Sequence, residues 1–303
     1  MDIYHEQSKN VWKTWLLMLT FLVVIIAIGY VFAMIYNNSL ILIIAIVFSL
    51  FMNFFSYWYS DKIVLSMYRA QQVTSREQNI DLWNVVENLS ITAGLPMPRV
   101  YIIPDSAPNA FATGRNKEHA AVAVTAGLLG LLNKTELEGV IAHELSHIGN
   151  RDILISTVVI VLVGFVSILS QMFLRGLMFG GGRNNNREGG NANAIFVIIG
   201  IVLAILSPIA VTLIQLAVSR KREYLADADG ALLTRYPEGL ASALRKISQY
   251  SQPMKQASQA TAHLFIANPF GTVGKKVVGL FATHPPIEDR IRILLGSRGA
   301  SAQ

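Results

Sequence analysis

The longest uncharged stretch of the sequence constrains the fold more than any other feature. Residues 14–60 contain no charged side chain and are interrupted only by a short polar turn at residues 37–39. The apolar runs on either side, residues 15–36 and 40–60, are each long enough to cross about 30 Å of hydrocarbon as a helix. Residues 1–60 are therefore predicted to form a transmembrane hairpin. A cleaved signal peptide is not favoured, because the first run is too long and a second follows at once.

The composition supports a membrane protein and excludes several kinds of site. Of the 303 residues, 52% are hydrophobic and only 15% are charged, which is too apolar for an ordinary soluble domain. There is no cysteine, so disulfides, cysteine-ligated metals and a cysteine nucleophile are all excluded. The net charge is +6, but the basic residues are scattered beside apolar segments. That distribution favours contact with a lipid bilayer, and we expect no nucleic-acid binding.

Two further uncharged runs lie in the second half of the chain. Residues 153–174 and 189–219 are both predicted to be membrane helices, which brings the expected number of transmembrane helices to about four. A stretch rich in glycine and asparagine, residues 175–193, links them and overlaps the start of the second run. We expect a connector without chemistry there, because no Gly-Lys-Ser/Thr follows that would complete a phosphate-binding loop.

The more polar remainder falls into two parts, residues 61–152 and 220–303, separated by the apolar segment 153–219. The first part is predicted to contain an amphipathic helix whose buried face includes Ile80, followed by three short strands. These elements are expected at residues 76–93, 99–103, 109–113 and 120–125. The predicted fold class is a mostly α membrane protein with a small α+β unit.

The strands lead into a helix that carries the pentapeptide His143-Glu-Leu-Ser-His147. A capping box at Thr135 and Glu138 is predicted to begin this helix, and Gly149 is predicted to stop it. Residues four apart lie on one face of a helix, so the two imidazoles can bind a single ion.

An imidazole pair at this spacing suits Zn²⁺. The adjacent Glu144 can take a proton from a water at the metal without occupying a coordination position. This pattern is typical of a metalloprotease. The alternative is a pair of surface histidines on an ordinary helix.

A third protein ligand is expected, because two histidines rarely suffice for zinc. Glu223 is the best candidate, and Asp227 lies on the same helix face, where it can orient an imidazole N–H. If the apolar runs between the pentapeptide and Glu223 cross the membrane and return, both emerge at the same membrane face. The alternative is a solvated acidic pair that balances the basic residues 220–222.

Four motifs in this order resemble the HtpX family of bacterial membrane zinc metalloproteases, relatives of the Ste24 prenyl-protein proteases and the Oma-type mitochondrial proteases. The motifs are Pro108-Asn-Ala-Phe-Ala-Thr-Gly114, His143-Glu-Leu-Ser-His147, Glu223-Tyr-Leu-Ala-Asp227 and Thr283-His-Pro-Pro-Ile-Glu-Asp-Arg290. The resemblance covers nearly the whole chain. It implies a zincin-like metalloprotease domain with one Zn²⁺ per chain on His143, His147 and Glu223. It also implies that Glu144 is the general base and then the proton donor, and that Asp227 holds His143.

The same resemblance implies roles for three more residues. Asn109 would align the substrate near the scissile carbonyl, and His284 and Arg290 would steady the tetrahedral intermediate or the ligand carboxylate. Which of the last two contacts the intermediate stays open. The non-catalytic alternative for Asn109 is that it forms an Asx-turn after Pro108, and the alternative for His284 is that it lies at the entry to a helix. The other histidines, His5, His119 and His263, are expected to be structural or on the surface.

The expected function is that of an integral membrane zinc endopeptidase that hydrolyses misfolded or damaged membrane proteins, a stress-response role in quality control that the resemblance implies. The distribution of basic residues predicts that the active site faces the cytoplasm, although Arg175, Arg183 and Arg187 oppose this orientation. The resemblance implies that the membrane is the bacterial inner membrane. An intramembrane protease would carry the motif inside a span, and a prenyl-protein (CAAX) processing enzyme would have more spans. A non-catalytic zinc-stabilised scaffold or chaperone would not need Glu144. The oligomeric state is not predicted.

Overall fold

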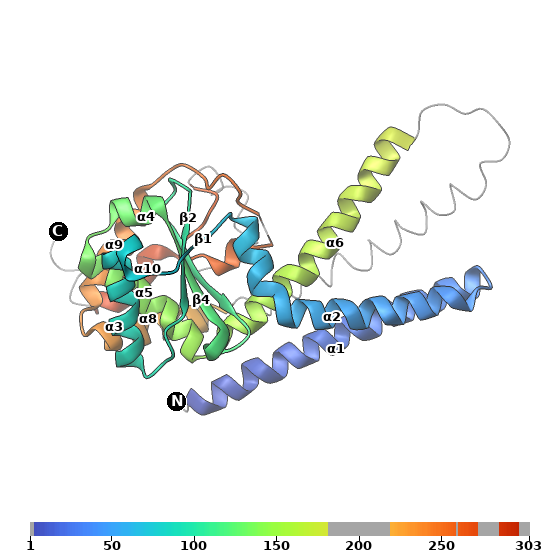
Figure 1. Cartoon of the computed structure of the whole chain (residues 1–303), viewed down its shortest axis with the longest axis horizontal. Coiled ribbons are helices and arrows are strands. Elements are labelled where there is room, and N and C mark those ends of the chain that lie inside the picture. Colours follow the sequence, from blue (N-terminus) through green and yellow to red (C-terminus); the bar gives the residue numbers. More distant parts are fainter. Residues whose placement is uncertain (1–2, 181–218, 259, 272–284, 297–303) are drawn as a thin grey trace.

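The computed structural model describes residues 3–180, 219–258, 260–271 and 285–296. A globular body contains a sheet with helices around it, and three long helices extend from the body on the same side (Figure 1). These helices are α1 (Ile3–Ile35), α2 (Ser39–Met67) and α6 (Asp152–Gly180).

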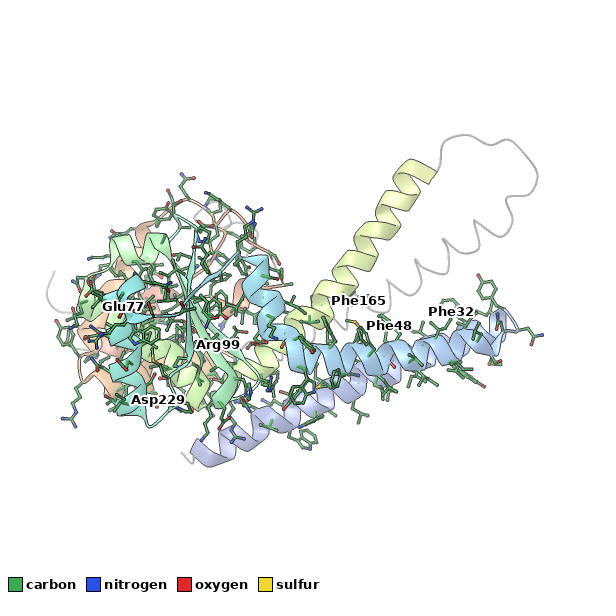
Figure 2. The ribbon with its side chains drawn as sticks, in the orientation of Figure 1. Phe32, Phe48, Glu77, Arg99, Phe165 and Asp229 are labelled. Atoms are coloured by element: carbon green, nitrogen blue, oxygen red, sulfur yellow. The ribbon has the colours of Figure 1, made fainter. Side chains whose placement is uncertain are left out.

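The helices α1 and α2 form the predicted hairpin. The segments Asn10–Ile35 and Ser39–Met67 are both long and apolar enough to cross a membrane, and only 22% and 17% of their apolar windows are buried. Most of their side chains therefore face outward, as contact with lipid requires (Figure 2). In the turn, Asn37 has a positive φ of 47°, and the Asn38 side chain accepts a hydrogen bond from Leu40 N at 3.0 Å. The polar turn thus caps the start of α2.

The helix α6 contains the third predicted apolar run and extends to Gly180, into the segment expected to be a connector. Phe165 of α6 packs on Phe48 of α2 with ring centroids 5.0 Å apart (Figure 2). The residues Asp152–Val166 and the preceding helix meet at 84°, and only when taken together do they count as a third candidate span. The fourth predicted span, residues 189–219, falls almost entirely outside the described residues, so the count of four stays a prediction.

Four strands form one mixed sheet in the order β1-β2-β4-β3. The strands β2 and β4 are parallel, and the other two neighbouring pairs are antiparallel. The three predicted strands are confirmed, and a fourth, shorter strand joins them at the edge next to β2. The strands are β1 (Gln71–Val73), β2 (Arg99–Ile103), β3 (Ala110–Gly114) and β4 (Ala120–Thr125). The other edge of the sheet is β3.

The helix α5, which carries the pentapeptide, lies at the centre of the body and packs against β3, α3, α8 and α9. Its apolar residues Val140, Ile141 and Leu145 are at most 1% exposed. Burying each such side chain stabilises the fold by roughly 1.5–3 kcal/mol, so the helix is fixed on several sides. The helices of the body are α3 (Ile80–Ala93), α4 (Ala126–Leu131), α5 (Lys134–Gly149), α8 (Arg220–Thr234), α9 (Pro237–Gln249) and α10 (Ile287–Leu295).

The prediction of the capping box of α5 is wrong by two residues. Asn133 Oδ1 accepts a hydrogen bond from Glu136 N at 3.0 Å, and Glu136 Oε2 accepts one from Asn133 N at 2.9 Å. The predicted pair, Thr135 and Glu138, has the same spacing one half-turn later. Asparagine caps a helix at least as well as threonine, so the earlier pair begins the helix.

The predicted helix at residues 76–93 also begins later than expected. Asn79 caps α3 by accepting a hydrogen bond from Leu82 N at 3.0 Å, and residues 76–78 form a separate 3₁₀ turn. The buried face contains Leu82 and its helical neighbours, whereas Ile80 is 56% exposed. Ile80 is the first residue of α3, and packing against the rest of the body buries the face that contains Leu82.

Candidate metal centre

A glycine allows α8 to cross α5 at the predicted metal site. A Cβ atom on Gly230 would lie 3.0 Å from His143 N and 3.3 Å from Ala142 C, closer than most side-chain contacts. The close approach brings Glu223 and Asp227, which lie on one face of α8, against the histidine pair of α5.

The structure brings together the three residues predicted to bind zinc. His143 Nε2 and His147 Nε2 lie 3.2 Å apart, and Glu223 carboxylate oxygens lie 3.8 Å and 3.5 Å from them. One donor atom from each residue falls within 4.8 Å of the others. Metal–ligand bonds of about 2.0–2.2 Å in a tetrahedral site separate the ligand atoms by about 3.4 Å. These donor atoms therefore fit a single zinc ion without rearrangement of the backbone.

Two carboxylates hold the far sides of the imidazole rings. Asp227 Oδ1 lies 3.0 Å from His143 Nδ1, and Asp152 Oδ2 lies 3.1 Å from His147 Nδ1. A proton on each Nδ1 leaves each Nε2 as an unprotonated donor directed at the common point. Carboxylates in this position are typical of histidines that bind a metal.

Arg290 is fully buried and anchors Asp227 with two hydrogen bonds, from Nε at 2.8 Å and from Nη2 at 2.6 Å. Its Nη1 donates to Ile266 O at 2.9 Å and lies 3.8 Å from Glu223 Oε2. Burial raises the pKa of Asp227, but the hydrogen bonds and charge of Arg290 and His143 outweigh it and bring the pKa to about 2. Arg290 therefore contacts the carboxylates around the cluster.

The charges around the cluster favour a cation. Burial lowers the pKa of His147, but the carboxylates of Asp152, Glu223 and Glu144 raise it more, to about 9. Arg222 balances part of this charge, with Nη1 at 3.5 Å from Asp152 Oδ1. The negative potential that stabilises a proton on His147 would stabilise a divalent cation at the same place.

Glu144 lies beside the cluster and is 1% exposed. Its carboxylate forms a hydrogen bond with the backbone of Ala112 in β3, while its Oε2 has no hydrogen-bond partner among the described residues. Burial is the main reason that its pKa rises to about 7, and Glu223 adds to the effect. An oriented carboxyl group with one unused oxygen and this pKa is suited to accept a proton near neutral pH.

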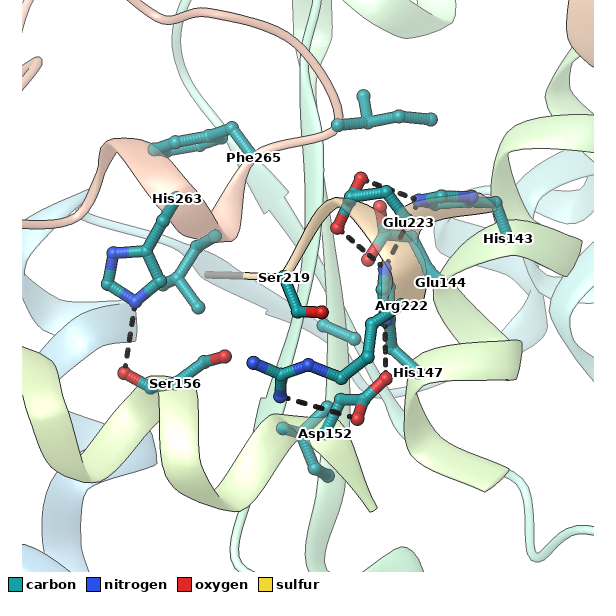
Figure 3. A pocket seen from close by; sticks show the side chains of 14 residues that line it. His143, Glu144, His147, Asp152, Ser156, Ser219, Arg222, Glu223, His263 and Phe265 are labelled. Carbon is teal, nitrogen blue, oxygen red and sulfur yellow. Dashed lines mark hydrogen bonds and ion pairs between the residues drawn. The ribbon is translucent and has the colours of Figure 1, made fainter. Parts of the chain in front are cut away.

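These groups line a small cleft of about 30 Å³, which has room for one or two water-sized groups. Figure 3 shows the two histidines, Glu144 and Glu223 converging on one side of it, with Arg222 and Asp152 next to them. The opposite wall comes from the segment 263–266.

The remaining predicted residues are not brought into this cleft by the described part of the structure. Asn109 is 2% exposed, and its side chain donates to Ala267 O at 3.0 Å and accepts from Ala267 N at 3.3 Å. Beside it, Ile266 N donates to Ala110 O at 3.0 Å. His284 lies outside the described residues. A role for Asn109 or His284 in catalysis stays a prediction.

Two residues of the site were not found by reasoning from the sequence. Asp152 is not predicted by any motif, although an acid in the first turn of the apolar segment, five residues after His147, is a usable signal. His263 was expected to be structural or on the surface. It is 7% exposed and lies in the cleft wall, with Nε2 at 3.3 Å from Ser156 O (Figure 3). Only the folding of the segment 263–266 over the cleft places it there.

Comparisons with known proteins give consistent matches. The sequence model of peptidase family M48 matches residues 76–298. A protease HtpX homolog of Thermoanaerobacter pseudethanolicus is 48% identical over 294 residues, which is 96% of this chain and 97% of that protein. A protease HtpX homolog of Pyrococcus furiosus is 54% identical over 256 residues, which is 84% of this chain and 85% of that protein. The crystal structure of S. mikatae Ste24p matches with a TM-score of 0.48 and 17% identity, over 88% of this chain and 62% of that one.

Proposed function

The chain belongs to peptidase family M48 as a membrane metalloprotease of the HtpX type, and we propose that it is a zinc endopeptidase whose active site lies against the cytoplasmic face of a bacterial inner membrane. The single observation that carries this proposal is the convergence of His143, His147 and Glu223 with Glu144 beside them. Two imidazoles and one carboxylate are a ligand set typical of catalytic zinc, which keeps a coordination position open.

Bound zinc would act as a Lewis acid that polarises the scissile carbonyl and makes a water acidic. Glu144 then takes the proton of the attacking water and later donates it to the leaving amine. Its free Oε2 and its raised pKa support this role, and the Ala112 backbone keeps the other oxygen in place.

The substrate backbone is expected to align along β3. Peptide groups point alternately to the two sides of a strand, so the Ala112 carbonyl lies on the same outer side as the Ala112 N–H that meets Glu144. That carbonyl can accept a hydrogen bond from a substrate N–H next to the scissile bond. Because the Ala110 carbonyl already accepts a hydrogen bond from Ile266 N, a substrate would pair with β3 from Ala112 onward.

This arrangement favours unfolded chains as substrates. Only an extended segment can pair with a strand edge and reach a cleft of about 30 Å³. Asp152, the first residue of α6, touches both His147 and Asn10 of α1, so the site lies where the membrane helices begin. Misfolded or damaged membrane proteins present extended segments at that level, which supports a role in protein quality control.

The test compares purified full-length protein with Glu144→Gln and with Glu138→Gln, a control on the same helix outside the cleft. Zinc content and cleavage of an unfolded protein such as casein are measured for each. Glu144→Gln should keep its metal and lose cleavage by about 10²–10⁴-fold, as expected for a general base. Cleavage by Glu144→Gln at the wild-type rate would overturn the assignment.

A further inference from the structure

A second groove lies where the body meets the end of α2, and it shares no lining residue with the metal cleft. Its volume is about 580 Å³, within the range of roughly 300–1,000 Å³ that is common for ligand sites. Phe54, Trp58 and Tyr59 of α2 form one wall, and the other includes Arg99, Arg115, Glu118 and His119. Figure 2 shows Arg99 at this junction between the body and the hairpin.

The aromatic wall belongs to a candidate membrane span. Phe54 is 58% exposed and Trp58 is 43% exposed, and both lie within the segment Ser39–Met67. Exposed tryptophan and tyrosine near the end of a span are typical of the headgroup level of a bilayer. The groove therefore opens at the level of the lipid headgroups, and its apolar side continues along the outer face of α2.

Two cations stand over this aromatic wall. The Arg115 guanidinium carbon lies 4.4 Å from the Trp58 ring centroid, and Lys62 Nζ lies 5.2 Å from the Tyr59 ring centroid. A ring contact of this kind uses the charge of the cation and leaves its N–H donors available. Among the described residues neither Lys62 nor Arg115 forms an ion pair or a side-chain hydrogen bond, so their donors can bind an anion.

The other charges of the groove do not cancel these two. Arg99 is paired with the buried Asp61, with Nη2 and Oδ2 2.6 Å apart, and this pair ties β2 to α2. Glu118 is the remaining carboxylate in the lining, and it is exposed. With Arg99 and Asp61 neutral as a pair, Lys62 and Arg115 leave the groove with a net positive charge.

We propose that this groove binds one anionic phospholipid. The headgroup phosphate lies between Lys62 and Arg115, and an acyl chain follows Phe54 and the exposed Phe51 along α2. A lipid fits better than a soluble phosphate because the cationic site and the lipid-facing side of the span are continuous. A lipid held there would fix the height of the body relative to the bilayer.

The test measures lipid binding by native mass spectrometry of the full-length protein in detergent, with phosphatidylglycerol and phosphatidylcholine of the same acyl chains as probes. Wild type should bind phosphatidylglycerol at least tenfold more tightly than it binds phosphatidylcholine. Basic residues near an anionic surface contribute about fivefold each. The double variant Lys62→Gln/Arg115→Gln should therefore bind phosphatidylglycerol about 25-fold more weakly, and Lys62→Arg/Arg115→Lys should retain binding.

The matched control is Arg235→Gln/Arg245→Gln, which removes two exposed cations away from the hairpin. Its affinity for phosphatidylglycerol should stay at the wild-type value. Equal weakening in both double variants would mean that only net charge matters and would overturn the proposal. Displacement of the lipid by millimolar glycerol phosphate would assign the site to soluble phosphates instead.

Discussion

Replacing Asp152 with asparagine should weaken metal binding although no predicted ligand is removed. Asp152 is 5% exposed and accepts hydrogen bonds from His147 Nδ1 at 3.1 Å and from Asn10 Nδ2 at 2.6 Å. An amide has one oxygen and one NH₂ group, so it must place its NH₂ against one of these two donors. Loss of such a carboxylate behind a metal-binding histidine typically costs 10–100-fold in metal affinity, and we expect a decrease of that size.

The measurement is the zinc dissociation constant of full-length protein from competition with a chromogenic chelator. Asp81→Asn, an exposed change in the first turn of α3, is the matched control and should leave the constant unchanged. Asn10→Ala tests the link to α1, because within the described part of the chain the Asn10 side chain reaches the metal site through Asp152 Oδ1 and the Asn150 carbonyl. Its effect on zinc affinity should be much smaller in the Asp152→Asn background than in wild type. Wild-type affinity in Asp152→Asn, or an Asn10→Ala effect that is equal in both backgrounds, would refute the reasoning.

Three further predictions concern how the surrounding residues hold the site. Arg290→Met leaves Asp227 buried without its cation and should lower the free energy of unfolding by about 3–5 kcal/mol. A melting curve recorded with zinc removed would show this loss of stability, and Arg290→Lys should lose less stability because it keeps a cation there. Gly230→Ala should lower stability by about 1–3 kcal/mol and weaken zinc binding, because the added Cβ would meet the backbone of α5. Gly130→Ala is the control and should change neither stability nor zinc binding, because the added Cβ would face open space. Burial raises the pKa of Glu136, but hydrogen bonds from Lys246, Ser242 and Asn133 outweigh it, so the pKa is lowered in the folded protein. The ionised Glu136 therefore stabilises the fold fully above the ordinary glutamate pKa of about 4.3, and this stabilisation is lost as the pH falls through the lower pKa of the folded state. Glu136→Gln should therefore melt at a lower temperature than wild type near neutral pH, and the difference in melting temperature should shrink in acid.

Local patterns in the sequence predicted the parts of the fold that depend on local chemistry. The hairpin follows from an uncharged stretch, and the histidine pair follows from helical spacing, because both are set by neighbours in the chain. The choice between Asn133 and Thr135 as the cap of α5 is also local, but the two candidates are equivalent in the sequence. Only the observed hydrogen bonds decide between them.

Contacts between distant segments were not predictable in this way. Arg290 binds Asp227 across 63 positions of sequence, and Asn10 binds Asp152 across 142. No spacing rule connects such residues. The same holds for the hydrogen bond from Ile266 N to Ala110 O, which covers part of the β3 edge. Burial of Glu144, which sets its raised pKa, likewise depends on the packing of β3 against α5.

Zinc stoichiometry in wild type and in Glu223→Gln is the most direct test of the central claim, that the histidine pair and Glu223 form a catalytic zinc site. Full-length protein is dialysed against a weak chelator and analysed for metal by mass spectrometry, with the exposed Glu77→Gln as control (Figure 2). We predict about one zinc per chain in wild type and in Glu77→Gln, and a large loss of zinc in Glu223→Gln. Unchanged zinc content in Glu223→Gln would contradict the account and place the third ligand elsewhere.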